Sequence, residues 1–408
     1  MLMRRLITTL VVALLALVVF IAGVVVGGHP EATGLTQLQG PLRGVLLGDS
    51  GQDLPSEVLD VLRRHYYRDI DDAQLQNHAT RALVAALDDP YTTYLDADEL
   101  AALTLHNDGA YVGVGIQIAA RDEAVIGTHV FPDSPAEKAG LRAGDRLVAV
   151  NGKPARGDRL ESVVATVRGP EGSRVKLTVD RDTTPARTVE LTRGRIAVPA
   201  VQGRIVRDGR RRVGYLRLMR FTRGASGALR ARIRQQLDAG VDGLVLDLRG
   251  DPGGLVSEAL GVAGTLLPSG TSVVTTEGRH SARRTLRTDG EPVSTDIPVV
   301  VLVDRNSASS SEIVAGALRD ARRAPLVGER TFGKALVQST WMLRDRGALK
   351  LTTARYLTPS GFNLAVRGLP PDVRAVDNPT TPRDEALDAA LARLRTGPTT
   401  PAGTLVAP

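Results

Sequence analysis

The sequence predicts a multi-domain protein of mixed α/β and β class, in which a small helical region and a β-rich domain precede an α/β core. Three observations support this prediction. The chain has 408 residues, 42% of them hydrophobic, which is enough for two or three domains with a sizeable core. Residues 110–195 contain short apolar runs separated by glycine turns. Beyond residue 195, predicted strands and helices alternate, as in α/β architecture.

The N-terminus predicts a membrane anchor over residues 1–28. Arg4 and Arg5 precede an uncharged, largely apolar stretch over 6–28, long enough to cross a hydrocarbon core of ~30 Å as a helix. A cleaved signal peptide would show a shorter apolar region and a small-residue cleavage site. We therefore expect an uncleaved signal anchor, a single pass, with the N-terminus in the cytoplasm and the rest of the chain on the extracytoplasmic side.

Residues 29–52 are glycine-rich and read as a linker, and residues 53–105 have a helical pattern. One helix is predicted to begin after a Ser56 cap, and a second over about 75–87 is predicted to end before Pro90. This region is too short to bury much surface alone, so we expect it to pack on a neighbouring domain or to mediate contacts in a homo-oligomer.

Composition excludes several functions. Aromatic residues make up 3% of the chain, and the net charge of +7 comes from scattered arginines, so no nucleic-acid partner is expected. The absence of cysteine excludes disulfides, thiol catalysis and cysteine-based metal sites. No cluster of ligating residues suggests a metal or a cofactor, and none is expected.

Residues 106–195 form the predicted β-rich domain. A helix is predicted to start at Ser134 and to end at Gly140, and Asn151-Gly152 predicts a hairpin. The segment SPAEKAGLRAGDRLVAVNG resembles PDZ domains of bacterial proteases, although tight turns in a purely structural β-domain are the alternative. PDZ domains hold a peptide C-terminus on the backbone amides of a glycine-containing loop while the peptide adds a strand. The loop implied here is Tyr111, Val112, Gly113, Val114, Gly115 and Ile116.

Residues 196–378 form the predicted α/β core, followed by a short helix and a flexible tail over 379–408. Buried strands are predicted at 213–219, 242–248, 297–303 and 324–328, and a helix at 310–321.

Two turns of this core carry candidate chemistry. Residues 304–312 hold four serines in five positions at a helix N-terminus, where a nucleophile gains from exposed amides; helix capping is the alternative, and spacing alone does not select one serine. Residues 247–254 read DLRGDPGG, and the paired glycines Gly253 and Gly254 let backbone amides approach a ligand as an oxyanion hole. The alternative is a tight turn without a ligand.

A candidate base for a serine is Lys334. Arginine cannot accept a proton, and the chain has only five lysines, one of which stands in the turn Gly333-Lys334. Its six histidines all lie outside the glycine-, serine- and proline-marked turns of the C-terminal half. A rival interpretation is a phosphate-binding P-loop over 328–334, but Ala335 stands where a P-loop needs Ser or Thr.

Seven ordered motifs resemble those of the C-terminal processing (tail-specific) proteases: LDDPYTTYLD, the PDZ segment, DLRGDPGG, NSASSSE, TFGKALVQ, YLTPSG and GLPPDV. The resemblance covers roughly residues 54–376. It implies a serine endopeptidase with a core of the crotonase/ClpP-like type, acting on the C-terminal regions of extracytoplasmic proteins that have free C-termini. It implies the following roles: Ser309 as nucleophile, Lys334 as base, Gln338 as its partner, and Gly253 or Gly254 together with Ser310 as oxyanion donors.

This chain differs from the family pattern at two positions, and the role of one further residue, Arg168, has two interpretations. Asp251 replaces a frequent Asn, which would weaken oxyanion binding if the carboxylate points inward, and Ala335 replaces a frequent Gly. Arg168 occupies a turn where such proteases can couple peptide binding to catalysis, or it is an ordinary surface arginine. The competing functional class is a non-catalytic PDZ scaffold on a protease-like fold.

The chemistry of the expected pair is demanding. A lysine acts as a base only when neutral, so its pKa must fall by about 3 units from ~10.4. Burial does this, and a neutral partner such as Gln338 orients the amine without restoring its charge. Contact between Lys334 and Gln338 requires a bent or helical backbone, since four strand residues span about 13 Å.

Overall fold

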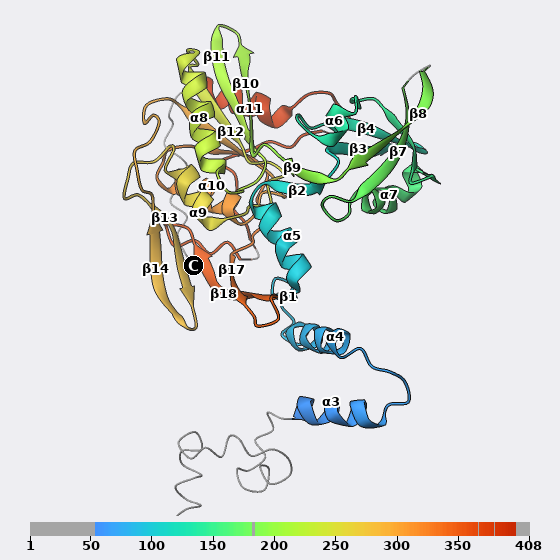
Figure 1. Ribbon diagram of the computed structural model, residues 1–408. Coiled ribbons are helices and arrows are strands. Elements are labelled where there is room, and N and C mark those ends of the chain that lie inside the picture. Colours follow the sequence, from blue (N-terminus) through green and yellow to red (C-terminus); the bar gives the residue numbers. More distant parts are fainter. Residues whose placement is uncertain (1–53, 182–183, 366, 379, 397–408) are drawn as a thin grey trace, which may run out of the picture. The chain divides into compact units, whose positions relative to one another are not determined.

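The computed structural model describes residues 54–181, 184–365, 367–378 and 380–396 (Figure 1). The chain divides into two units, residues 1–79 and 80–408. The predicted anchor over 1–28, the linker over 29–52 and the tail after residue 396 lie outside the described residues. Within the described ranges, no helix combines the length and the apolar character needed to cross a bilayer.

The described part of the first unit is helical. Helix α3 spans Leu54–His65, and helix α4 spans Asp72–Ala85, running past the end of the unit. The prediction that Ser56 caps the first helix is wrong, because the helix already includes Leu54. Neither helix contains a buried residue, so neither forms a core of its own.

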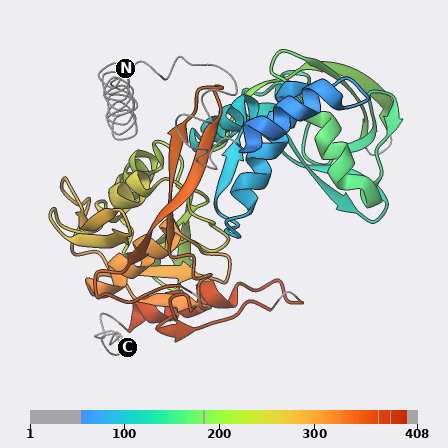
Figure 2. The ribbon, with the colours of Figure 1, turned by 90° about the horizontal axis from the view of Figure 1, so that it is seen from below.

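The β-rich domain is an antiparallel sheet with two helices against it (Figure 2). Its strand order is β3-β4-β5-β7-β8, with β6 beside β5, and helix α7 (Leu160–Val167) contacts β3 and β5. Short helix α6 (Pro135–Lys138) is capped by Ser134, and Asn151 and Gly152 take positive φ angles in the β5–β6 hairpin, as predicted. The strands are β3 (Ile116–Arg121), β4 (Ala124–Val130), β5 (Arg146–Val150), β6 (Lys153–Pro154), β7 (Arg174–Arg181) and β8 (Thr184–Thr192).

The expected peptide-binding segment is divided between two elements. Tyr111–Gly113 belong to β2 (Ala110–Gly113), which pairs with β9 (Gly194–Ala197) rather than with the main sheet, and Ile116 begins β3. Val114 and Gly115 connect the two strands.

The core of the second unit is a six-stranded sheet in the order β10-β11-β12-β15-β16-β19. Only β10 is antiparallel to its neighbour; the other pairs are parallel. The four predicted core strands correspond to β11, β12, β15 and β16. The bounds are β10 (Val201–Asp208), β11 (Arg211–Leu218), β12 (Gly243–Asp247), β15 (Val299–Val303), β16 (Leu326–Gly328) and β19 (Val373–Arg374).

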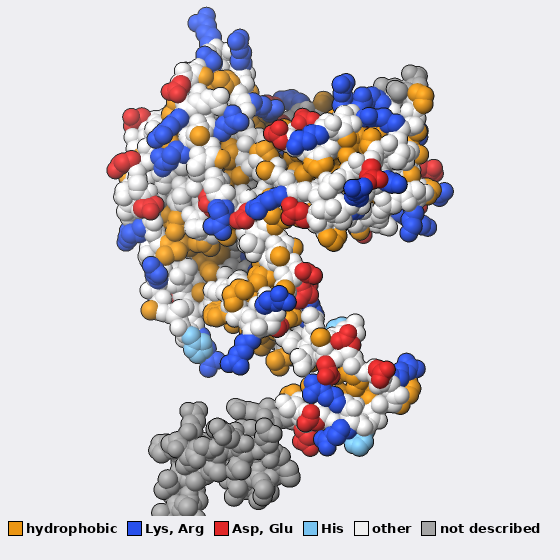
Figure 3. Space-filling view, viewed as in Figure 1, with side chains coloured by type: hydrophobic (Ala, Val, Ile, Leu, Met, Phe, Trp, Pro, Cys, Tyr) orange, Lys and Arg blue, Asp and Glu red, His pale blue; other side chains and the backbone are white. Residues whose placement is uncertain are grey.

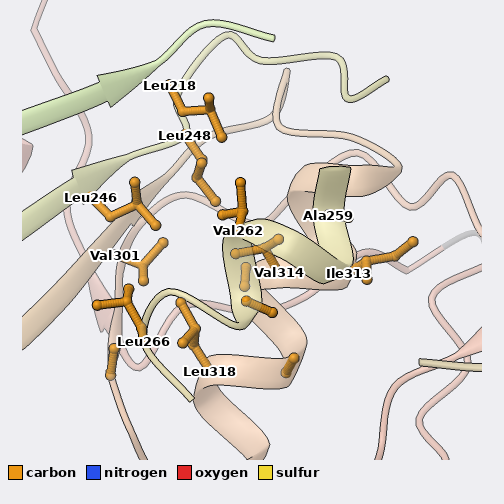
Figure 4. Close-up of a cluster of buried hydrophobic side chains, with 14 of the residues drawn as sticks. Leu218, Leu246, Leu248, Ala259, Val262, Leu266, Val301, Ile313, Val314 and Leu318 are labelled. Atoms are coloured by element: carbon orange, nitrogen blue, oxygen red, sulfur yellow. The ribbon is translucent and has the colours of Figure 1, made fainter. Parts of the chain in front are cut away.

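Helices cover both faces of this sheet. Helices α8 (Ala225–Asp238), α9 (Val256–Ala263) and α10 (Ser310–Asp320) share one buried apolar cluster with strand residues such as Leu246 and Val301 (Figure 4). Helix α11 (Glu385–Arg395), predicted from its Ala/Leu pattern, packs on the opposite face against Val245 and Val300. All five residues of β12 and of β15 are buried, as expected for a sheet covered on both sides.

A second, five-stranded sheet lies beside this core. Strands β1, β18, β13 and β14 follow one another in it, and β17 pairs with β18. Helix α5 (Ala97–Asn107), which begins at an Asp96 capping box, follows β1 in the chain. The strands are β1 (Thr93–Leu95), β13 (Ser272–Gly278), β14 (Ser281–Arg287), β17 (Leu336–Met342) and β18 (Ala348–Leu357).

Candidate active site

Three neighbouring parallel strands deliver the candidate residues to one edge of the six-stranded sheet. The segment containing Gly253 and Gly254 follows β12, the segment containing Ser309 follows β15, and Lys334 follows β16. Ligands of open α/β sheets bind at the carboxyl ends of the strands, where such segments meet.

Ser309 stands immediately before α10 in a strained backbone conformation, with φ 55° and ψ −115°. Such conformations cost about 1–3 kcal/mol for a residue other than glycine and persist only where surrounding contacts enforce them. One such contact is the bond from the Ser309 amide to Glu312 Oε2 at 2.9 Å.

Glu312 connects the two turns that carry Ser309 and Lys334. Its buried carboxylate accepts hydrogen bonds from the amides of Ser309, Gly333 and Lys334 at 2.8–2.9 Å and from Thr331 Oγ1 at 2.6 Å. Burial raises the pKa of Glu312, and these donors oppose the rise. The carboxylate therefore holds the backbone of both turns in place.

The glycine turn contacts the nucleophile segment directly. A Cβ added at Gly253 would come within 2.9 Å of Ser309 Cβ, so only glycine fits there, and Ser310 Oγ donates to the Gly254 carbonyl at 3.0 Å. The Gly253 amide donates to Asp251 Oδ1 at 2.8 Å, so it is not free to bind an oxyanion. The amides of Gly254 and Ser310 donate to no acceptor among the described residues.

Asp251 is fully buried in this turn. Its backbone carbonyl accepts from the Ala308 amide at 3.0 Å and from Ser311 Oγ at 2.9 Å, which joins the turn to α10. Its Oδ2 atom has no hydrogen-bond partner among the described residues. Burial raises the pKa of Asp251 to about 7, so the carboxyl group holds a proton at mildly acidic pH.

Lys334 is half-buried, and its ammonium lies 4.6 Å from the centroid of the Tyr91 ring. Burial lowers the pKa of Lys334, as does the charge of Lys350, whereas Asp89 and Glu312 act in the opposite direction. Within the described part of the chain, Lys334 Nζ and Ser309 Oγ form no hydrogen bond with each other.

Gln338 lies near the start of β17, where the pairing with β18 is irregular between Val337 and Gln338. Its Nε2 atom is buried and has no hydrogen-bond partner among the described residues. The expected contact between Gln338 and Lys334 is thus not formed in this arrangement of the side chains.

Tyr356 is a buried neighbour of both turns that the sequence analysis did not single out. Its hydroxyl donates to the Lys334 carbonyl. Burial raises the pKa of Tyr356 well above its usual range, Glu312 adds to this, and a hydrogen bond involving Ser309 opposes it.

The candidate peptide site of the β-rich domain is a groove between β3 and α7, with a cavity of about 240 Å³. Of the six predicted residues, Val112 and Gly115 do not line it. Arg168, at the end of α7, does. Its lining is Tyr111, Gly113, Val114, Ile116, Gln117, Ile118, Phe131, Val164, Val167 and Arg168.

The nucleotide-binding alternative is not supported by this fold. A P-loop places its lysine at a helix N-terminus, whereas Lys334 is followed by strand β17. No group of three or more His, Asp or Glu side chains suited to a metal ion occurs in the part of the chain that the structure describes.

Tyr91, Glu312 and Tyr356 are not among the site residues that the sequence predicts. For Glu312 a signal existed, since Ser309-x-x-Glu312 has the spacing of a capping box. Tyr91 precedes β1 and Tyr356 lies in β18, and the pairing of these two strands brings together segments that are distant in the sequence. No local pattern marks them.

Comparison with known proteins identifies three regions. Residues 212–375 match the profile of peptidase family S41, residues 128–181 that of a PDZ domain, and residues 55–99 that described as the activating protease CtpB N-terminal domain. The PDZ-like prediction is thereby confirmed.

Curated relatives and a solved structure extend this result. The carboxy-terminal processing protease CtpA of Bacillus subtilis (strain 168) is 31% identical over 328 residues, covering 80% of this chain and 70% of that protein. The carboxyl-terminal-processing protease of a Picosynechococcus strain is 39% identical over 297 residues, covering 72% and 71%. The solved photosystem II D1 C-terminal processing protease has a TM-score of 0.51 and 32% identity, covering 84% of this chain and 91% of that one. This chain therefore belongs to peptidase family S41, among the carboxy-terminal processing proteases, and is a serine-type peptidase with a PDZ domain.

Proposed function

We propose that the protein is an endopeptidase that uses Ser309 and Lys334 as a catalytic dyad and cleaves the C-terminal regions of extracytoplasmic proteins. The observation that carries the proposal is the meeting of the β12, β15 and β16 turns at one sheet edge, with Glu312 bonded to the backbone on both sides of the dyad.

In this reaction neutral Lys334 takes the Ser309 hydroxyl proton as Oγ attacks the peptide carbonyl carbon. The tetrahedral oxyanion is stabilised by backbone amides, and Gly254 and Ser310 are the donors we assign, because the Gly253 amide is held by Asp251. Lys334 then gives its proton to the leaving amine. Water, deprotonated by the same lysine, hydrolyses the acyl-enzyme and restores Ser309.

Gln338 supports this cycle as a neutral partner. Its unpartnered Nε2 lies buried near the start of β17, four residues after Lys334. Movement of the lysine from Tyr91 toward Ser309 would allow the amide group to orient the amine. A neutral amide does so without favouring the ammonium form.

The PDZ domain, in this proposal, binds the free C-terminus of the substrate. The groove between β3 and α7 is lined mostly by apolar residues and by Arg168, which suits an apolar tail that ends in a carboxylate. We also propose that residues 1–28 anchor the chain in a membrane, which would restrict its substrates to extracytoplasmic proteins, and that the chain forms homo-oligomers.

The test is cleavage of an unstructured protein with an apolar C-terminus by the full chain, compared with Ser309→Ala and Lys334→Ala. Loss of cleavage in both variants, with the circular dichroism spectrum unchanged, is expected. A phosphonylating probe should label the parent chain and not Ser309→Ala. Cleavage that survives Ser309→Ala would refute the assignment of the nucleophile, and absence of both cleavage and labelling in the parent chain would favour a scaffold.

A further inference from the structure

A large apolar cavity lies beside the candidate nucleophile. It has a volume of about 750 Å³, is open to solvent on one side, and is bordered by the β13–β14 hairpin, strands β17 and β18, and the first turns of α9 and α10. In Figure 3, hydrophobic side chains surround a hollow in this region. The apolar lining is Val256, Val274, Ala282, Leu286, Ile313, Val337, Trp341, Leu351, Ala354 and Tyr356.

Two lining residues connect the cavity to Ser309. The Ile313 amide donates to the Ser309 carbonyl at 2.9 Å, so Ile313 lies one helical turn from the nucleophile. Tyr356 lines the cavity, and its hydroxyl donates to the carbonyl of Lys334, whose amide shares Glu312 Oε2 with the Ser309 amide. A peptide bond under attack by Ser309 would therefore place an adjoining side chain at the mouth of the cavity.

The charged residues that line the cavity are all basic. Arg279 and Arg284 lie on the β13–β14 hairpin together with His280, and no Asp or Glu lines the cavity. The nearby Glu277 is paired with Arg355 at 2.6 Å. Neither Arg279 nor Arg284 has an ion-pair partner in the described residues, so both guanidinium groups are available to an acidic ligand.

We propose that this cavity binds an apolar substrate side chain next to the scissile bond and that Arg279 and Arg284 favour substrates with Asp or Glu beside that residue. The inference rests on the proposed function and adds a substrate class to it: peptide segments that combine an apolar residue with adjacent acidic residues. The apolar lining supplies hydrophobic stabilisation, and the arginines supply electrostatic selection through charge-assisted hydrogen bonds.

The hairpin provides a matched control. Side chains alternate between the two faces of a strand, so Arg283 and Arg284 project to opposite faces of β14. Arg284, paired with Thr276, lines the cavity, whereas Arg283 does not. Both are exposed, so the same charge reversal at either site should leave the fold intact.

The experiment compares three unstructured reporters with the same apolar tail and the same apolar residue at the cleavage site, flanked by Asp, Asn or Lys. For the parent chain we expect kcat/KM to fall in the order Asp, Asn, Lys, with about threefold to tenfold between successive substrates, because exposed charges are well screened. The spread should shrink at high salt. Arg284→Glu leaves Arg279 beside one carboxylate, so the preference should be lost and the three substrates should be cleaved alike, whereas Arg283→Glu should preserve the order.

Binding provides a readout that does not need catalysis. In a Ser309→Ala background, Arg284→Glu should weaken binding of a fluorescent acidic peptide with an amidated C-terminus, and Arg283→Glu should not. Equal effects of the two reversals, or a parent chain indifferent to the flanking charge, would overturn the proposal. Failure of the dyad alone would abolish cleavage while leaving this binding difference, so the two failures are distinguishable.

Discussion

The ammonium of Lys334 lies 4.6 Å from the centre of the Tyr91 ring, and no hydrogen bond joins it to Ser309 among the described residues. An aromatic face stabilises a cation, by about 0.5–2 kcal/mol depending on desolvation. Opposing influences therefore act on one amine: burial favours the neutral base, whereas the Tyr91 ring adds to the carboxylates of Asp89 and Glu312 in favouring the charged form.

The first prediction concerns this contact. Cleavage should rise with pH as Lys334 loses its proton, and its lowered pKa places that rise below the range of a free lysine. Tyr91→Leu removes the ring, so the pKa should fall further and the rise should move to lower pH by about 0.4–1.5 units. The measurement is kcat/KM against pH. Tyr91→Phe keeps a ring and should leave the profile in place; a shift to higher pH in Tyr91→Leu would contradict the prediction.

The second prediction concerns stability. Burial raises the pKa of Asp251 from 3.8 to about 7 in the folded protein, so the folded state binds the proton more tightly than the unfolded state. The stability that this gives is present at about pH 4 and is lost as pH rises toward 7. The unfolding free energy of Asp251→Asn should therefore rise relative to that of the parent chain by on the order of 2–4 kcal/mol as the pH is raised from 4 to 8.

Urea unfolding followed by the fluorescence of Trp341, the single tryptophan, measures this difference at each pH. Asp122→Asn changes an exposed carboxylate in a turn and serves as the control, with no comparable gain expected. If the advantage of Asp251→Asn over the parent chain were the same at pH 4 and pH 8, the proposed ionisation of Asp251 would be wrong.

A third prediction concerns Glu312. Each of its two carboxylate oxygens accepts two hydrogen bonds. In Glu312→Gln the NH₂ group replaces one of these oxygens, so in either orientation of the amide it faces two donors with which it cannot form a hydrogen bond. We expect a loss of about 2–4 kcal/mol in unfolding free energy. The activity should fall by about a hundredfold, since both turns shift.

Glu329→Gln is the matched control for Glu312. Glu329 is only partly buried, and its contact with Arg305 is a weak one of 3.6 Å. Urea unfolding and kcat should stay within experimental error of the parent chain in this variant. Parent-like values in Glu312→Gln would show that the two turns hold their positions without this carboxylate.

A fourth prediction tests the PDZ groove. Val164 lines the groove and is half-buried, whereas its neighbour Ala165 is exposed and does not line it. Val164→Asp should lower kcat/KM by about tenfold for a substrate with an apolar free C-terminus, because the carboxylate repels the tail and desolvation is costly. Ala165→Asp should have little effect.

The same comparison with an amidated tail isolates the terminal carboxylate. If the groove binds that group, amidation should reduce cleavage by the parent chain and should remove most of the difference between the two variants. If kcat/KM for the substrate with the free tail fell equally in Val164→Asp and Ala165→Asp, the tail would not bind in this groove.

Individual strands and turns of this chain can be predicted from its sequence, because each depends mainly on residues that are neighbours in the chain. The buried strands β11, β12, β15 and β16 follow from apolar runs, and the β5–β6 hairpin follows from Asn151-Gly152. The PDZ segment and the ordered motifs led to the protease family, which the comparisons confirm. The start of α3 was misplaced because helix ends depend on weak capping preferences.

The order of motifs along the chain determined that a serine, a lysine and a glycine pair belong to turns of one α/β core. Only the tertiary structure decided how they meet. The parallel pairing of β12, β15 and β16 places their turns at one edge, Glu312 bridges two of them, and the pairing of β1 with β18 sets the segment that carries Tyr91. These contacts join residues far apart in the sequence, so no local pattern encodes them.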